Sequence, residues 1–461
     1  MRTIAFALFT IGLIAGSAAL SAAPLDESRV ARIVRAELKK LGVPSASVAI
    51  VLDDRIAYAQ AFGNARLNPQ RAATSTDRYQ IGSISKQFLA ASMLMLQEDG
   101  KLSLENGVGQ YLPELDSAAN VTLRQLLSHT AGIRDFWPQD YVFTRMLSPI
   151  SPSEILERWA RQPLDFPPGE RWQYSNTGYT LGGVIFEKVA GEPLFSSLQR
   201  RVFGPLHMSS VANADEGAVD SSDAVGYTRA ALGPLRPAPH VGQGWLFAAG
   251  ELAMTAEDLA RWDLSIIDET VMKPASYREF EREILLKNGA GTRYALGLDV
   301  RLWSERRVIG HGGATSGFIS HNLIYPDQRA AIVVLTNSDA ANAATAISDK
   351  LQDLVFESVS PLDNARLMEA RRVFDGLRHG KLDRTLLSEN ANEYFTPETV
   401  RDIAQGIAPL GPVKSFRLMR IGTRGGMDFR VYEIKLEKRE LELVARSLPD
   451  GKVEQYMISA K

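Results

Sequence analysis

The first part of the chain alternates between helix-type and strand-type hydrophobic patterns. From Ser28 to Leu41 apolar residues return at helical spacing, which predicts an amphipathic helix with one buried side. The runs Ala46 to Leu52 and Ile56 to Phe62 are short and rich in apolar residues, and the turn Asp53-Asp54 separates them. This part of the chain is therefore predicted to form a helix followed by a β-hairpin.

A nearly continuous apolar run further along predicts a buried helix. It extends from Phe88 to Leu96, follows the short extended run Tyr79 to Gly82, and ends before Asp99-Gly100. The stretch that follows, to about Met208, is mostly helical in pattern and contains loops rich in proline and glycine. We expect it to form a helical subdomain.

Strand-type runs return late in the chain. These runs are Tyr294 to Val300, Arg307 to Ile309, Phe318 to Tyr325 and Ala331 to Leu335. A predicted helix from Asn342 to Phe356 follows them. Because strands lie at both ends and helices between them, one sheet assembled from distant segments is expected. The predicted fold class is α/β (α+β), an antiparallel sheet flanked by helices with an inserted helical subdomain.

A smaller α+β unit is predicted after a boundary near Ser358 to Pro361. Helical stretches come first and strand runs follow: Asn364 to Arg378, Leu382 to Leu387, Pro397 to Ile407, then Ser415 to Ile421, Met427 to Leu436, Leu441 to Ser447 and Val453 to Ile458. This order resembles the cone-shaped fold of nuclear-transport-factor-like accessory domains. The unit shows no catalytic constellation, so it is interpreted as a packing or partner-binding appendage, with self-association as a further hypothesis. The predicted division is 1–23, 24–357 and 358–461.

The first residues have the composition of a secretory signal peptide. Arg2 precedes an apolar run from Ile4 to Ile14, and small residues follow from Ala15 to Ala23. The run is too short for a typical transmembrane helix, and cleavage is expected near Ser21, with an uncleaved N-terminal anchor as the alternative. The predicted location is therefore the periplasm or the medium outside the cell.

Composition narrows the class of protein. The chain has 461 residues, of which 45% are hydrophobic and 23% charged, as in an ordinary soluble protein of more than one domain. The formal net charge of -2 gives no general attraction to nucleic acid or to an anionic membrane. Cysteine is absent, so no disulfide supports the fold, and the six histidines show no metal-binding spacing. We expect no metal, no cofactor and no nucleic-acid partner.

The candidate chemistry begins at Ser83-Ile84-Ser85-Lys86, at the start of the predicted apolar helix. Residues three positions apart share a helix face, so the Ser83 hydroxyl and the Lys86 amine can meet. The N–H groups at a helix N-terminus favour developing negative charge, and apolar surroundings disfavour the charged form of Lys86, as a base requires. The alternative is a capping serine with a solvated lysine.

Two further motifs follow in order. Tyr174-Ser175-Asn176 comes after the turn-rich stretch Phe166 to Glu170; a phenol can relay a proton, and an amide can hold a lysine and a substrate carbonyl. His311-Gly312-Gly313 follows a predicted strand, where glycines let a substrate backbone approach and the Ala314 N–H can donate to an oxyanion. The alternatives are a half-buried loop tyrosine and a glycine-rich hairpin turn with an incidental histidine.

With the three motifs in this order, the chain resembles the class C β-lactamase-like serine hydrolases. That family includes penicillin-binding carboxypeptidases, D-aminopeptidases and some esterases. The stretches Leu123 to Ile133, Pro168 to Tyr179 and Ala248 to Leu259 are also similar to parts of the family. The resemblance covers about Glu27 to Phe356 and implies a β-lactamase/transpeptidase-like fold there.

The resemblance also implies catalytic roles. Ser83 would be acylated, with Lys86 as its base or proton partner. Tyr174 would carry a proton to and from the leaving group and later help to activate water. Asn176 would hold Lys86 and the substrate carbonyl.

On the strand side, the N–H groups of Ser83 and Ala314 would form the oxyanion hole, and His311 and Gly313 would line the substrate site. His129, in the family-like stretch, is expected to be structural and to fix a loop by hydrogen bonds.

The third motif departs from penicillin-hydrolysing relatives, which usually carry Lys-Thr-Gly in its place. A permanent ammonium there attracts a substrate carboxylate, whereas His311 is often neutral at neutral pH and Gly312 lacks the hydroxyl. We therefore expect an exported hydrolase that uses a Ser83 acyl-enzyme on a small-molecule ester or peptide-like amide. The alternatives are a β-lactam hydrolase proper and a non-catalytic ligand-binding protein that keeps the fold.

Overall fold

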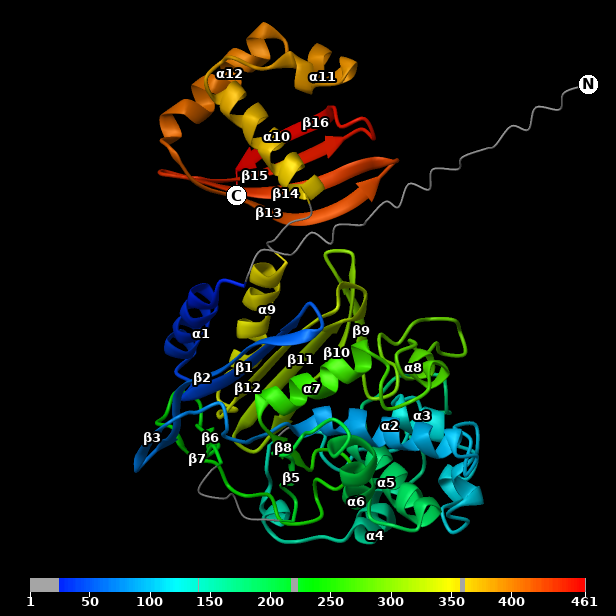
Figure 1. Ribbon diagram of the computed structural model, residues 1–461. Helices are drawn as coiled ribbons and strands as arrows, with labels where there is room; N and C mark the ends of the chain where they lie inside the picture. The colour runs from blue at the N-terminus through cyan, green and yellow to red at the C-terminus, as the bar shows by residue number, and fades with distance from the viewer. Residues whose placement is uncertain (1–24, 140, 217–222, 357–360, 461) are drawn as a thin grey trace, which may run out of the picture.

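A seven-stranded antiparallel sheet is the centre of the computed structural model, which describes residues 25–139, 141–216, 223–356 and 361–460 (Figure 1). The strand order is β3-β2-β1-β12-β11-β10-β9, so strands from the two ends of this region pair at its middle, as predicted. The strands are β1 (Ser45–Leu52), β2 (Arg55–Leu67), β3 (Gln70–Ala72), β9 (Asp299–Trp303), β10 (Arg306–Thr315), β11 (Phe318–Tyr325) and β12 (Ala330–Thr336).

Helices cover both faces of this sheet (Figure 1). α1 (Glu27–Leu41) and α9 (Ala343–Val355) pack on one face and form a core with its apolar side chains. α7 (Ala256–Ile267) packs on the other face, where a larger core begins. α2 (Ser85–Glu98) belongs to this larger core and is buried along most of its length, which agrees with its nearly unbroken apolar sequence.

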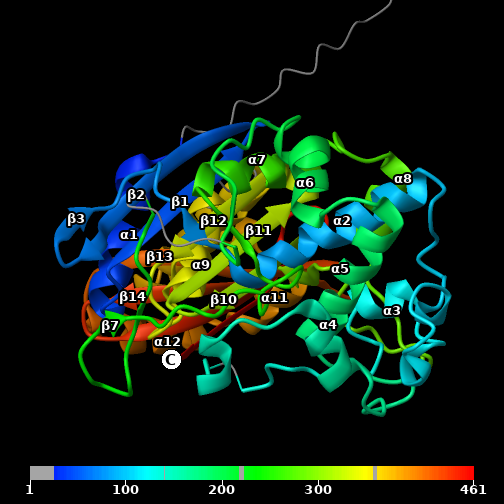
Figure 2. The same ribbon diagram turned by 90° about the horizontal axis from the view of Figure 1, so that it is seen from below.

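The helices α3 to α6 lie in the stretch predicted to form a helical subdomain, whereas α8 lies after the predicted end of that stretch at about Met208. In Figure 2, α2 to α5 lie on one side of the molecule and β1 to β3 on the other. The helices are α3 (Leu123–Leu127), α4 (Pro152–Ile155), α5 (Asn176–Ala190), α6 (Leu194–Leu198) and α8 (Pro274–Phe280). The short strands are β4 (Tyr79–Gln80), β5 (Ala212–Asn213), β6 (Tyr227–Thr228), β7 (Arg236–Pro237) and β8 (Leu252–Met254).

Two predicted strand boundaries are wrong, and both concern glycine-containing segments. The run Tyr294 to Val300 is a turn for most of its length, because Gly297 adopts φ 73° and the Ala295 N–H donates to the Leu298 carbonyl. The strand β9 starts only at Asp299. Conversely, His311-Gly312-Gly313 lies inside β10 and not after a strand, and its residues pair with β11. The prediction missed this part of the strand because glycines do not show a strand-type hydrophobic pattern.

The C-terminal unit has its helices first and an antiparallel sheet afterwards, as predicted (Figure 1). Its apolar side chains form a core of their own, which includes Phe374 and Leu443. The stretch Leu382 to Leu387 contains only one 3-10 turn, and the helix α11 was not predicted. Its elements are α10 (Pro361–Arg378), α11 (Glu389–Tyr394), α12 (Pro397–Ile407), β13 (Val413–Arg424), β14 (Met427–Leu436), β15 (Glu440–Ser447) and β16 (Val453–Ala460).

Two predictions concern segments outside the described residues. The predicted signal peptide occupies residues 1–23, and the predicted boundary near Ser358 to Pro361 falls mostly on residues 357–360. Both therefore stay predictions. Within the described ranges, no helix combines the length and the apolar character that crossing a membrane requires.

Candidate active site

Ser83 lies in a tight turn directly before the buried helix α2. The turn, Gly82–Ile84, is a single 3-10 turn that leads into Ser85, the first residue of α2. Gly82 has φ 51°, and a Cβ there would lie 2.8 Å from the Ala314 carbonyl oxygen, so glycine is required by both backbone and space. The turn therefore holds Ser83 against strand β10.

Lys86 is fully buried on α2 and points at three oxygen atoms. Its Nζ lies 3.0 Å from Ser83 Oγ, 2.9 Å from Asn176 Oδ1 and 2.7 Å from the Ala249 carbonyl oxygen. Burial lowers the pKa of Lys86 to about 7, although the nearby Asp135 carboxylate acts in the opposite direction. A neutral amine keeps two N–H groups for Asn176 and Ala249 and turns its lone pair to Ser83. The arrangement can therefore present a base near neutral pH.

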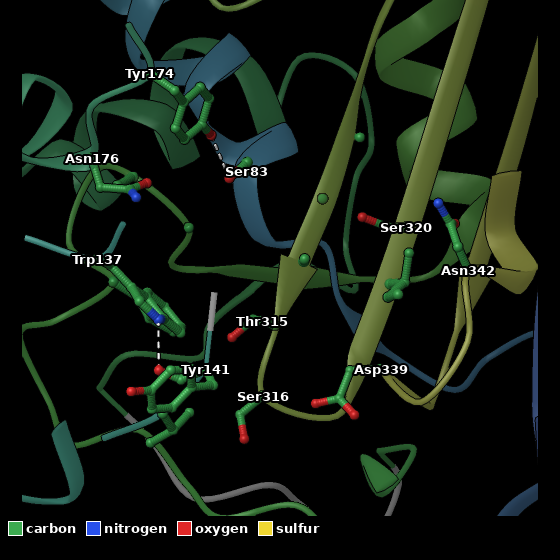
Figure 3. A pocket seen from close by; sticks show the side chains of 18 of the residues that line it. Ser83, Trp137, Tyr141, Tyr174, Asn176, Thr315, Ser316, Ser320, Asp339 and Asn342 are labelled. Atoms are coloured by element: carbon green, nitrogen blue, oxygen red, sulfur yellow. Dashed lines mark hydrogen bonds between the residues drawn. The ribbon is translucent and has the colours of Figure 1, made fainter. Parts of the chain in front are cut away.

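Tyr174 approaches Ser83 from another segment (Figure 3). Its hydroxyl lies 2.7 Å from Ser83 Oγ and donates to it. Tyr174 comes directly before α5, whose N-cap is Ser175 and whose first residue is Asn176. The Ser175 hydroxyl accepts a hydrogen bond from the Gly178 N–H and fixes this start. One capped helix start therefore positions both the phenol and the amide.

Asp135 orients Asn176, although no sequence motif marks it. Its carboxylate accepts the Asn176 backbone N–H at 2.9 Å and the side-chain Nδ2–H at 3.2 Å. The amide oxygen of Asn176 is thereby left to face Lys86. Burial raises the pKa of Asp135, while these hydrogen bonds and Lys86 oppose that rise. Its place just after the family-like stretch Leu123 to Ile133 was the available signal, but a lone loop aspartate is not distinctive.

A cluster of neutral rings lies beside Tyr174. Burial lowers the pKa of His311, whose Nδ1 donates to the Gly312 carbonyl, so its Nε2 accepts from Tyr294 OH at 2.8 Å. Burial also lowers the pKa of His129, and the His129 ring centre is 4.2 Å from that of Tyr174. His129 Nδ1 accepts the N–H of the residue after Tyr174 at 3.1 Å, which agrees with its predicted loop-fixing role. Tyr294 has no counterpart among the sequence motifs.

Strand β10 passes very close to the turn Gly82–Ile84. A Cβ at Gly313 would lie 1.9 Å from the Ile81 carbonyl oxygen and 2.2 Å from Ser320 Oγ, whereas a Cβ at Gly312 would meet nothing within 4 Å. The approach also brings the Ala314 backbone nitrogen within 2.9 Å of a Cβ built on Gly82. The backbones that carry the two predicted oxyanion donors are therefore neighbours.

A buried polar network connects α2 with β10. The Asn322 amide oxygen accepts the His311 backbone N–H at 2.9 Å and Gln87 Nε2–H at 3.0 Å. Gln87 Oε1 in turn accepts Trp262 Nε1–H at 2.8 Å, and Asn322 Nδ2 donates to Asp263 Oδ1 at 2.7 Å. Because unpaired polar groups are expensive in a core, this network fixes α2 relative to the strand.

A cavity of about 1010 Å³ opens beside Ser83 (Figure 3). Six of the seven predicted site residues line it, and the seventh, Lys86, is fully buried. The loop stretch after Ala212 contributes part of the wall through Thr228, Arg229 and Pro239. The lining aromatic side chains are Phe136, Trp137, Tyr141, Trp172, Tyr174, Trp245 and Tyr294. Such a cavity suits a small molecule with an apolar portion.

Comparisons of the sequence with known proteins point to one family. A family sequence model described as Beta-lactamase matches residues 30–355. The chain is 25% identical over 324 residues to Protein flp of Staphylococcus aureus (strain N315), covering 68% of this chain and 63% of that protein. It is 28% identical over 316 residues to a D-aminopeptidase of Cereibacter sphaeroides, covering 66% of this chain and 59% of the relative. The chain thus spans about three fifths of these relatives' length.

Solved structures share the fold. The octameric penicillin-binding protein homologue from Pyrococcus abyssi has a TM-score of 0.64 and 20% identity, and the match covers 95% of this chain and 96% of that one. D-amino acid amidase from Ochrobactrum anthropi SV3, complexed with L-phenylalanine, has a TM-score of 0.64 and 22% identity. This match covers 74% of the present chain and 99% of the amidase chain. The predicted β-lactamase/transpeptidase-like fold is confirmed by these neighbours.

Substitution of Gly313 by alanine is expected to destabilise the site, because the added methyl group would collide with Ile81 and Ser320. Overpacking of this kind lowers the free energy of unfolding by roughly 1–3 kcal/mol. Gly312→Ala is the matched control, since its methyl group would enter open space. Thermal unfolding of both variants measures the difference, and equal melting temperatures would contradict the close approach of β10.

Proposed function

The chain belongs to the Beta-lactamase family, and from this premise we propose that it is a serine hydrolase that acts through a Ser83 acyl-enzyme. The observation that supports this best is the position of Ser83 Oγ, 3.0 Å from Lys86 Nζ and 2.7 Å from Tyr174 OH. A nucleophile with two proton-handling groups at hydrogen-bond distance suits acyl transfer.

In the proposed acylation, neutral Lys86 accepts the Ser83 proton while Oγ attacks the substrate carbonyl carbon. The N–H groups of Ser83 and Ala314 donate to the developing oxyanion. Tyr174 passes a proton to the leaving group as the ester or amide bond breaks. Asn176, held by its own hydrogen bonds, keeps the amine and the substrate carbonyl in line.

In the proposed deacylation, water attacks the acyl carbon and releases Ser83. Tyr174 and Lys86 take up the proton of that water and return one to the serine oxygen, so the enzyme ends as it began.

The substrate class is proposed to be an ester or a small peptide-like amide, met outside the cytoplasm. The neutral His311 and the missing hydroxyl at Gly312 offer little to the carboxylate of a β-lactam. The relatives named as a D-aminopeptidase and a D-amino acid amidase support an amide or peptide substrate. The composition of residues 1–23 supports export.

Ser83→Ala is expected to abolish this activity. The rate of nitrophenyl ester or D-amino-acid amide hydrolysis should fall by about 1000-fold or more, because the nucleophile is lost. Ser92→Ala, also buried on α2, is the matched control and should keep the parental rate within a few-fold. Parental hydrolysis by the Ser83 variant would exclude the proposed acyl-enzyme, and a chromogenic β-lactam in the same assay tests the alternative substrate.

The rate is expected to depend on the ionisation of Lys86. Since burial lowers its pKa to about 7, the amine is protonated and inactive as a base below that pH and neutral above it. The apparent kcat/KM should therefore rise as the pH increases through about 7 and then level off. A profile measured with a non-ionising ester tests this, and a rate that is flat or falls across that range would contradict Lys86 as the base.

A further inference from the structure

The ionisable groups that line the cavity leave it with a negative charge. Among the described lining residues, Asp299 and Asp339 are carboxylates, and His311 is kept neutral by burial. Arg229 is a cation, but its guanidinium donates to the Gly42 carbonyl oxygen at 3.0 Å. Two carboxylates against one guanidinium give the described lining a formal charge of -1, with His311 neutral.

Asp339 lies at the opposite end of the cavity from Ser83 (Figure 3). The view shows it next to Ser316, past the C-terminal end of β10, while Ser83 and Tyr174 lie higher in the view. The turn that carries Ser83 packs against Ala314, near the same end of β10. Its Oδ2 accepts the Gly317 N–H at 2.9 Å, which holds the carboxylate at the hairpin tip. Among the described residues, nothing donates a hydrogen bond to its Oδ1.

Two aromatic side chains lie across the cavity from this carboxylate (Figure 3). Trp137 Nε1 donates to the Tyr141 carbonyl at 2.9 Å, so the loop that carries both rings is tied together. The Tyr141 side chain is 65% exposed and lines the cavity, as does Trp137. Faces of tryptophan and tyrosine rings attract cations, and a facing carboxylate adds to that attraction.

We propose that this end of the cavity binds an ammonium group, so that the substrate attacked by Ser83 carries a positive charge at a distance from its scissile carbonyl. The proposal rests on the proposed function and names its substrate class. The ammonium pairs with Asp339 and is covered by the rings of Trp137 and Tyr141, while the intervening chain passes the C-terminal end of β10. A carboxylate in the same position is repelled by Asp339, so the site prefers a substrate with an ammonium to one with a carboxylate.

The test uses nitrophenyl esters of one alkanoate chain that ends in an ammonium, a methyl or a carboxylate, in a series of chain lengths. We expect the ammonium ester to have the highest kcat/KM at the length that reaches Asp339, by about 10-fold over the methyl ester. Asp339→Asn should remove this advantage, because an amide oxygen still accepts the Gly317 N–H but carries no charge. Asp299→Asn removes another carboxylate from the cavity lining and is the matched control for the overall negative charge of the cavity. This variant should keep the advantage of the ammonium ester.

The outcomes separate this inference from the proposed function. If no ester of any type is hydrolysed, the proposed function fails and the inference fails with it. If the methyl ester is hydrolysed in a Ser83-dependent reaction but the ammonium ester has no advantage at any length, the inference alone is overturned. The same follows if Asp339→Asn keeps the advantage, or if both aspartate variants lose it equally.

Discussion

The burial of the Lys86 amine is the constraint on which the rest of the site depends. A lysine without solvent is stable only if it is neutral or fully hydrogen-bonded, and here its Nζ has three oxygen partners within 3.0 Å. Those partners come from the turn that carries Ser83, the start of α5 and the loop before β8. If any of these segments moved, Lys86 would lose a partner, so its burial holds the three segments together.

The position of strand β10 is the second constraint, because the backbone on both sides of the reacting carbonyl must be in place. Gly82 and Gly313 allow the turn and the strand to approach more closely than any side chain would permit. Asn322 then fixes the strand to α2 through His311 and Gln87. In this way one buried network fixes the relative positions of the proposed base, the proposed nucleophile and the expected oxyanion donors. The proposed preference for substrates without a carboxylate at this position rests on His311, on the same strand, whose pKa is lowered by burial.

Much of the fold could be predicted from local sequence, because the periodicities are strong. The bounds of β11 and β14 match the hydrophobic runs, and the apolar run beginning at Phe88 identified α2. The candidate site residues were found through motifs, and the structure brings these distant motifs together around one serine. The strand that carries His311 is longer than predicted, because its glycines interrupt the hydrophobic pattern of a strand. Its full length becomes visible only from its pairing with β11.

Residues that act through long-range contacts could not be predicted in this way. Asp135 and Tyr294 carry no distinctive local motif, because their importance lies in partners about 41 and 17 positions away along the chain. Asp339 likewise becomes relevant only when the hairpin tip and the loop at Trp137 face each other across the cavity. Folding determines such pairs, and sequence spacing does not.

The most direct test of the central claim is rapid acid quenching during ester turnover, followed by peptide mass spectrometry. We predict an acyl group on the peptide that contains Ser83; turnover with the acyl group on another residue, or with none, would contradict the proposed acyl-enzyme.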